Sequence, residues 1–264
     1  MKQHTLQRHY FHQRNRVFTH LFNRIAAFLL LSVPLVAADL SAFLGERLDY
    51  DLYYRGFNTV DSRMWIEQED SLTFTIIWTV ETRPLWGLLF NINNRYETVV
   101  HSASQQLLET RKCIDQKNIQ QQWHTIYDWD ENMAITNQKH RWPVRPKAHN
   151  VLWLLYDLRQ RRLTPGDSLR YLLDVESQLW QLRGIVPQAN ESTADIIIDF
   201  EFSPARPIQP RAWKTDLLTN RLARDRSRLI IHMSPAPERV PQRIRFGSDD
   251  EEVEMILRHR VSGR

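Results

Sequence analysis

The stretch that decides the fold reads Leu72-Thr-Phe74-Thr-Ile76-Ile-Trp78-Thr-Val80, with a large apolar residue at every second position. Threonine fills three of the four positions between them. Alternation with a period of two residues predicts a β-strand with one buried and one exposed face. Such strands are typical of antiparallel sheets.

The same alternation recurs along most of the chain after residue 38. It is found at 48–54, 169–175, 194–202, 244–246 and 253–257. Turn-forming residues separate these segments, for example at 130–132 and 164–167. We therefore predict that residues 39–264 form a single, mainly β domain built on an antiparallel sheet.

One segment has helical rather than strand periodicity. Its apolar side chains lie at positions i, i+3, i+4 and i+7: Val151, Leu154, Leu155 and Leu158. This spacing predicts a helix over about 148–162 that packs on the sheet, and Thr164-Pro165 should end it. A second, short helix is expected at about 215–224.

Charge divides the chain into two unequal parts. Residues 1–38 hold five of the 35 Lys and Arg residues and none of the 31 Asp and Glu residues. The remaining 30 basic and 31 acidic residues give 39–264 a net charge of −1, which offers no electrostatic basis for binding nucleic acid. Seven scattered glycines exclude a glycine-rich phosphate loop. A single cysteine, Cys113, excludes an intramolecular disulfide and a Cys-based zinc site.

Residues 1–38 have the order of a secretion signal. Basic residues extend to Arg24, an apolar run follows, and Val36-Ala37-Ala38 places small residues before Asp39. We predict a cleaved Sec-type signal peptide and a periplasmic protein of the bacterial envelope, with no stable membrane span after cleavage. An uncleaved anchor is the alternative, but the run is shorter than the ~20 apolar residues that cross a bilayer.

No motif for metal binding or catalysis stands out. Residues 128–139 begin like a calcium loop, but Met133 and Lys139 occupy the positions where glycine and glutamate are needed. The histidines lack H-x-x-x-H spacing, and there is no G-x-S-x-G turn. We predict no metal, no cofactor and no enzymatic activity, although a triad assembled only in space leaves no trace in the sequence.

Four segments in order along 43–258 resemble the DUF3108 family of exported bacterial proteins. They are Gly45–Gly56, Asn94–Glu97, Leu163–Asp167 after the predicted helix, and Val240–Ile244. The resemblance implies an antiparallel curved sheet or open β-barrel, like those of periplasmic lipid-handling proteins. The family has no assigned activity, so the resemblance supplies no catalytic residue.

Aromatic residues carry the strongest hint of a binding site. The apolar run Pro84–Phe90 lies between two predicted strands, where a loop is normally polar. We predict an apolar ligand site bordered by Trp78, Trp86, Phe90 and Trp153. A curved sheet covered by a helix can provide such a site, and its ligand would be a lipid or acyl chain of the envelope.

Two other hypotheses remain open. Core packing alone explains any single tryptophan, in which case the interior is filled. The protein would then be a scaffold that contacts envelope proteins through loops and strand edges. A hydrolase acting on an envelope polymer is the third hypothesis.

Overall fold

A computed structural model describes residues 40–87, 91–116, 118–187, 195–207, 216, 219–248 and 252–263. The predicted signal peptide, 1–38, lies outside the described residues. A short 3-10 turn, η1 (Leu40–Phe43), precedes the first strand. The strands are β1 Arg47–Tyr54, β2 Phe57–Gln68, β3 Thr73–Thr82, β4 Asn93–His101, β5 Leu107–Gln116, β6 Ile119–Asp128, β7 Met133–Thr136, β8 His140–Pro143, β9 Ser168–Val175, β10 Gln178–Ile185, β11 Ile196–Pro204, β12 Arg228–Met233, β13 Pro241–Gly247 and β14 Val253–Val261.

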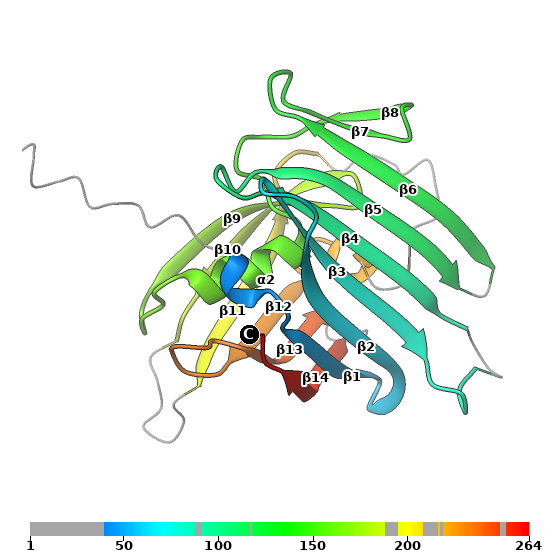
Figure 1. Ribbon diagram of the computed structural model, residues 1–264, viewed down its shortest axis with the longest axis vertical. Helices are drawn as coiled ribbons and strands as arrows, with labels where there is room; N and C mark the ends of the chain where they lie inside the picture. The colour runs from blue at the N-terminus through cyan, green and yellow to red at the C-terminus, as the bar shows by residue number, and fades with distance from the viewer. Residues whose placement is uncertain are drawn as a thin grey trace, which may run out of the picture. The chain divides into compact units, whose positions relative to one another are not determined.

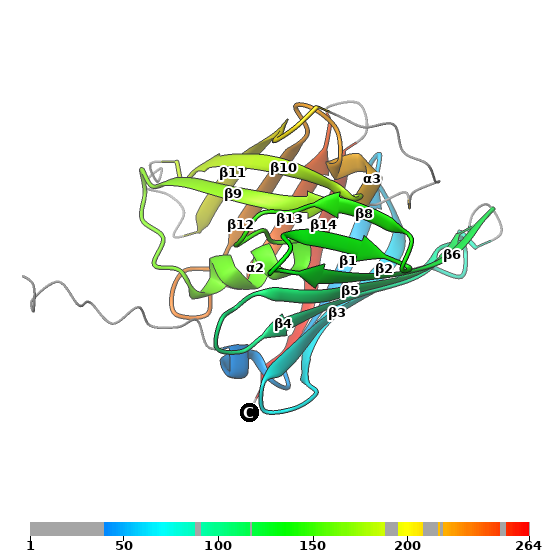
Figure 2. The ribbon, with the colours of Figure 1, turned by 90° about the horizontal axis from the view of Figure 1, so that it is seen from above.

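All fourteen strands belong to one antiparallel sheet that curves strongly without closing (Figures 1 and 2). Each strand pairs with the next along the chain, except that β8 and β9 do not pair. Instead β1 pairs with β14, so the first and last strands meet in the middle of the sheet and β8 and β9 form its two edges. The predicted mainly β, antiparallel, open-barrel fold is confirmed.

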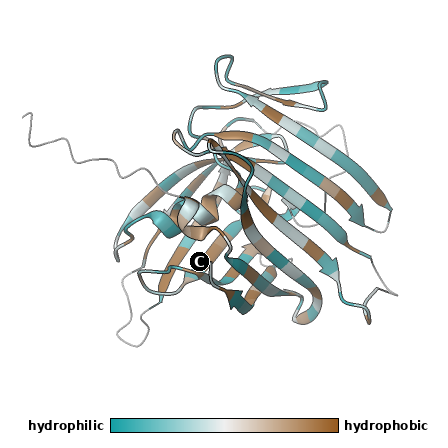
Figure 3. Ribbon diagram, viewed as in Figure 1, coloured by the Kyte–Doolittle hydropathy of each residue, from teal (hydrophilic) through white to brown (hydrophobic). Residues whose placement is uncertain are grey.

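Hydrophobic and hydrophilic residues alternate along the strands, visible as bands of colour in Figure 3. Burial is not strictly alternating in β3, because Thr75 and Ile77 are buried as well. In β3, Phe74, Ile76, Trp78 and Val80 are all buried. They join one hydrophobic cluster with side chains from most other strands and from the helix between β8 and β9. Burial of each such side chain contributes about 1.5–3 kcal/mol, so this cluster holds the curved sheet together.

One glycine is required by this packing. Gly184 in β10 lies opposite Phe200 in β11. A Cβ at residue 184 would lie 2.3 Å from the Phe200 ring, closer than real Cβ contacts. Glycine at this position therefore lets the fully buried phenylalanine lie flat across the neighbouring strand.

Helix α2 (Val151–Gln160) confirms the predicted helix and connects the two sheet edges. The Asn150 side chain caps it by accepting a hydrogen bond from the Trp153 amide. The helix ends at Gln160 because Arg161 is already extended, before the predicted stop at Thr164-Pro165. The second helix, α3 (Thr219–Leu222), is shorter than expected. No helix in the described ranges is long and apolar enough to cross a membrane.

A buried ion pair fastens α2 to the sheet. Both terminal nitrogens of Arg159 donate to the Glu46 carboxylate, at 2.5 and 2.9 Å. Arg260 of β14 donates to the same carboxylate at 2.9 Å. The Arg159 guanidinium also lies over the Phe43 ring, 4.1 Å from its centroid. This contact joins the last turn of α2 to the residues around β1 and β14.

Candidate functional site

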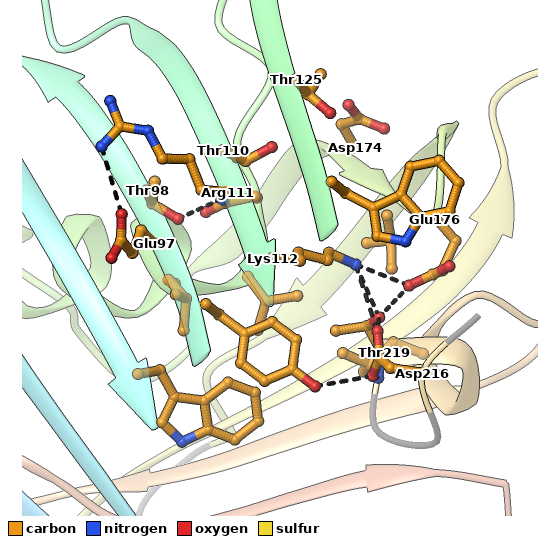
Figure 4. Close-up of a pocket in the computed structure, with 18 of the residues that line it drawn as sticks. Glu97, Thr98, Thr110, Arg111, Lys112, Thr125, Asp174, Glu176, Asp216 and Thr219 are labelled. Carbon is orange, nitrogen blue, oxygen red and sulfur yellow. Dashed lines mark hydrogen bonds and ion pairs between the residues drawn. The ribbon is translucent and has the colours of Figure 1, made fainter. Parts of the chain in front are cut away.

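A partly open cavity of about 110 Å³ lies between the concave face of the sheet and α2 (Figure 4). Its apolar side comes from strands on both sides of the β1–β14 junction and from the helix. The main apolar lining residues are Met64, Trp78, Leu152, Leu155, Leu229, Ile244, Phe246 and Met255. A cavity with this lining can hold an apolar group away from water.

The opposite wall of the cavity carries a row of threonines on four neighbouring strands. Thr98 of β4 lies opposite Thr110 of β5, Thr110 opposite Thr125 of β6, and Thr125 opposite Thr136 of β7. The Thr125 and Thr136 hydroxyls are 2.5 Å apart. Asn150 donates to Thr98 at 2.6 Å and so ties the start of α2 to this row. The cavity therefore combines a mainly apolar lining with a row of hydroxyl groups.

A charged cluster around Lys112 lies beside this wall (Figure 4). The Lys112 ammonium is 2.8 Å from Glu176 and 3.5 Å from Asp216, and it donates to the Thr219 hydroxyl at 3.0 Å. Asp216 also accepts a hydrogen bond from Tyr96 at 3.0 Å. The Thr219 hydroxyl, which has one proton to donate, lies within hydrogen-bond distance of both carboxylates, and the Thr219 backbone amide donates to Asp216 at 2.7 Å. The cluster joins β4 and β5 to α3 and to the turn after β9.

Burial and charge shift the pKa values of this cluster in opposite directions. Burial lowers the pKa of Lys112, but the carboxylates of Glu176 and Asp216 outweigh it and hold that pKa above its usual value. Burial raises the pKa of Asp216, but Lys112 and the Thr219 hydrogen bonds bring it below its usual value. Lys112 is thus held as an ammonium, so it cannot accept a proton from the Thr219 hydroxyl as a general base.

A third buried carboxylate, Asp174, lies between the two sheet edges. Asp174 of β9 accepts hydrogen bonds through Oδ2 from the Tyr127 hydroxyl at 2.7 Å and from the Trp142 indole at 3.3 Å. Its other oxygen, Oδ1, is buried and has no hydrogen-bond partner. Burial raises the pKa of Asp174 to about 6, although the hydrogen bonds from Tyr127 and Trp142 lower it. Side chains, rather than a strand ladder, therefore bridge β9 to β6 and β8.

Four residues were predicted to border the site, and the structure separates the three of them that it describes. Trp78 lines the cavity, stacks on Tyr96 with ring centroids 4.8 Å apart, and donates to the Ser62 hydroxyl. Trp153 is fully buried in α2, where it stacks on His149 at 5.6 Å and is not among the cavity-lining residues. It packs on that imidazole ring because its side chain lies off the apolar stripe of the helix.

Trp86 lies away from the cavity. The chain turns at Pro84–Gly87, and the Trp86 ring packs against exposed Phe57 with centroids 5.8 Å apart. Phe90 lies outside the described residues, so the predicted shared face of Trp86 and Phe90 has no structural description. In the part of the chain that is described, the candidate site thus keeps Trp78 and adds residues that the sequence did not single out.

Those added residues are mostly polar and come from distant parts of the chain: Thr98, Thr110, Lys112, Thr125, Thr136, Asp174, Glu176, Asp216 and Thr219. One signal was available, since Lys112 alternates in phase with buried Ile114 and Gln116. A charge at an inward position of a strand suggests a buried partner. Within the described ranges, no three His, Cys, Asp or Glu side chains come together as metal ligands would.

Comparison with known proteins supports the fold only. No family model and no curated protein matches the chain. Among solved structures, it is similar to a β-barrel-like protein of the domain of unknown function DUF1849 from Brucella abortus. The match has a TM-score of 0.55 and 7% identity, and covers 83% of this chain and 98% of the other. At this identity the likeness shows a shared β-barrel-like architecture.

Proposed function

We propose that this protein binds, without catalysis, a hydrophobic or amphiphilic molecule such as a lipid or an acyl chain. The observation that carries the proposal is the cavity under α2, which has a mainly apolar lining, a row of hydroxyl groups and an opening. Ligand sites commonly combine an apolar lining with a few placed polar groups. Trp78 is the predicted site residue that this proposal retains.

The size of the cavity limits what it can hold. An engineered apolar cavity of about 150 Å³ in another protein accepts benzene. The 110 Å³ here therefore suits a short segment of a chain or a single ring. A longer acyl chain would extend through the open side, so short amphiphiles are the right first probes.

Filling the cavity should weaken binding. Val151, half-buried at the start of α2, lines the cavity. We expect Val151→Phe to weaken the binding of octan-1-ol at least about tenfold, a loss of roughly 1.4 kcal/mol, measured by isothermal titration calorimetry. Ile197→Phe is the matched control, because Ile197 is equally half-buried in β11 and does not line the cavity. Equal affinities for the two variants would contradict the proposal.

We further propose that the protein is exported to the periplasm, like the DUF3108 proteins that its sequence resembles. The support is the charge asymmetry of residues 1–38 and the small residues before Asp39. Mass spectrometry of the protein from the periplasmic fraction should find an N-terminus at or near Asp39. Recovery of the intact chain from the membrane pellet would show instead that the segment is an anchor.

One surface favours the scaffold hypothesis as a second candidate. Phe57 and Leu85 are 60% and 79% exposed, and Trp86, the residue after Leu85 in the same turn, packs on the Phe57 ring. Grouped exposed apolar side chains often mark protein contacts. If wild-type protein fails to bind octan-1-ol, this surface becomes the better guide to function.

A further inference from the structure

The charges of the cavity point to the kind of polar head that it accepts. Three buried carboxylates line it, Asp174, Glu176 and Asp216, with at most 9% of each residue exposed. Two cations, Lys112 and Arg111, are also in the lining. The availability of each charge for a ligand depends on its existing partners.

Both cations are already engaged. Lys112 has three N–H donors and faces three oxygen partners, from Glu176, Asp216 and Thr219. Arg111 is directed to the outer face, where it donates to Glu109 at 2.9 Å and to Glu97 at 3.4 Å. An anionic head would thus find no uncommitted cation in the described lining and would meet three negative side chains.

One of the carboxylates, in contrast, has an oxygen without a hydrogen-bond donor. Asp174 uses only Oδ2, for Tyr127 and Trp142, while its buried Oδ1 lacks a partner. A buried carboxylate oxygen without a donor is costly. Oδ1 itself is closed off from solvent, so a ligand N–H group reaches it, and removes that cost, only when the side chains around it shift. The Thr125 and Thr136 hydroxyls, which line the same cavity, can also accept hydrogen bonds.

Building on the proposed function, we propose that the cavity selects an amphiphile with a cationic head, such as a primary alkylamine, over one with a carboxylate or phosphate head. The carboxylates supply the charge complement, Asp174 has one oxygen without a hydrogen-bond donor, and the apolar residues hold the chain. A fatty acid is accordingly the wrong probe for this site.

Three probes with the same eight-carbon chain separate the head from the chain: octylamine, octan-1-ol and octanoate. By calorimetry at pH 7 we expect octylamine to bind at least about tenfold more tightly than octanoate, with octan-1-ol between them. Octanoate binding as tightly as octylamine would overturn the head selectivity while leaving the cavity proposal intact. Failure of all three to bind would overturn both.

Asp174→Asn tests the role of the free oxygen. It keeps the shape of the side chain and an acceptor for Tyr127 and Trp142 but removes the charge. We expect octylamine affinity to fall about five- to tenfold and octan-1-ol affinity to change less than twofold. Asp130→Asn, at an exposed turn, is the control and should bind both probes like the wild type. A parallel loss of both probes in Asp174→Asn would mean that Asp174 has only a structural role.

The pH dependence of the wild type tests the same point if the variant fails to fold. Octylamine affinity should rise between about pH 5 and pH 7 as Asp174 loses its proton, because its pKa lies near 6. The titratable groups around Asp174 are Tyr127, which donates to it, and Lys112 and Glu176, whose charges act on it. His149 meets it through the backbone, where the His149 carbonyl accepts from the Asp174 amide. Lys112 and Tyr127 have raised pKa values and keep their protons, and burial lowers the pKa of His149. An affinity that does not change with pH would contradict the proposal.

Discussion

Replacing Arg159 with methionine is expected to destabilise the protein by about 3–5 kcal/mol, the usual cost of removing one partner of a buried ion pair. The side chains of Arg159 and Glu46 are 1% and 3% exposed. Methionine keeps most of the length of the side chain but leaves the Glu46 carboxylate buried with only Arg260 beside it. Chemical denaturation monitored by circular dichroism measures the change in the free energy of unfolding.

Two further variants identify the cause of that loss. Arg228→Met removes an arginine that pairs with Asp199 on the surface, and we expect a cost of at most about 1 kcal/mol. The double variant Arg159→Met/Glu46→Gln removes the stranded charge and should be more stable than Arg159→Met alone. If the double variant is the less stable of the two, Arg260 alone is enough to hold the buried Glu46 carboxylate, and the loss in Arg159→Met comes from packing against Phe43.

The alternation and helical spacing were sufficient to predict the class of the fold. Residues 73–80 of the alternating stretch lie in β3, whereas Leu72 precedes the strand and is exposed, and the stripe from Val151 to Leu158 lies in α2. The pairing of β1 with β14 was not predictable from these patterns, since a strand's own sequence sets which face is buried but not which strand lies beside it. The resemblance supplied the curvature, which the structure confirms.

The candidate site was far less predictable. The charged cluster is made of residues far apart in the sequence, since Glu176 and Asp216 follow Lys112 by 64 and 104 residues. They meet only after the sheet curves. Asp174 occupies the polar phase of β9, where a carboxylate normally faces solvent; it is buried because the β6–β8 corner reaches across the open edge. Tryptophan was a misleading signal, because a large ring fills a core, a pocket or a surface turn equally well.

Trp153→Ala and Trp86→Ala should therefore have very different effects. Trp153 is 1% exposed and lies parallel to the His149 ring, with Tyr171 edge-on to the same imidazole. Removing a large buried aromatic side chain costs about 3–5 kcal/mol, and we expect that loss at Trp153. Trp86 is half-buried at a surface turn and packs on the exposed Phe57 ring, so its removal should cost about 1 kcal/mol.

Denaturation of both variants, with octan-1-ol binding measured on each, distinguishes packing from ligand binding. Because neither ring lines the cavity, each folded variant should bind octan-1-ol within about twofold of the wild type, a difference of only about 0.4 kcal/mol. A large loss of binding in Trp86→Ala with little loss of stability would show that the turn at Pro84–Gly87 reaches the ligand, as the sequence first suggested. Equal destabilisation by the two substitutions would instead contradict the placement of Trp86 outside the core.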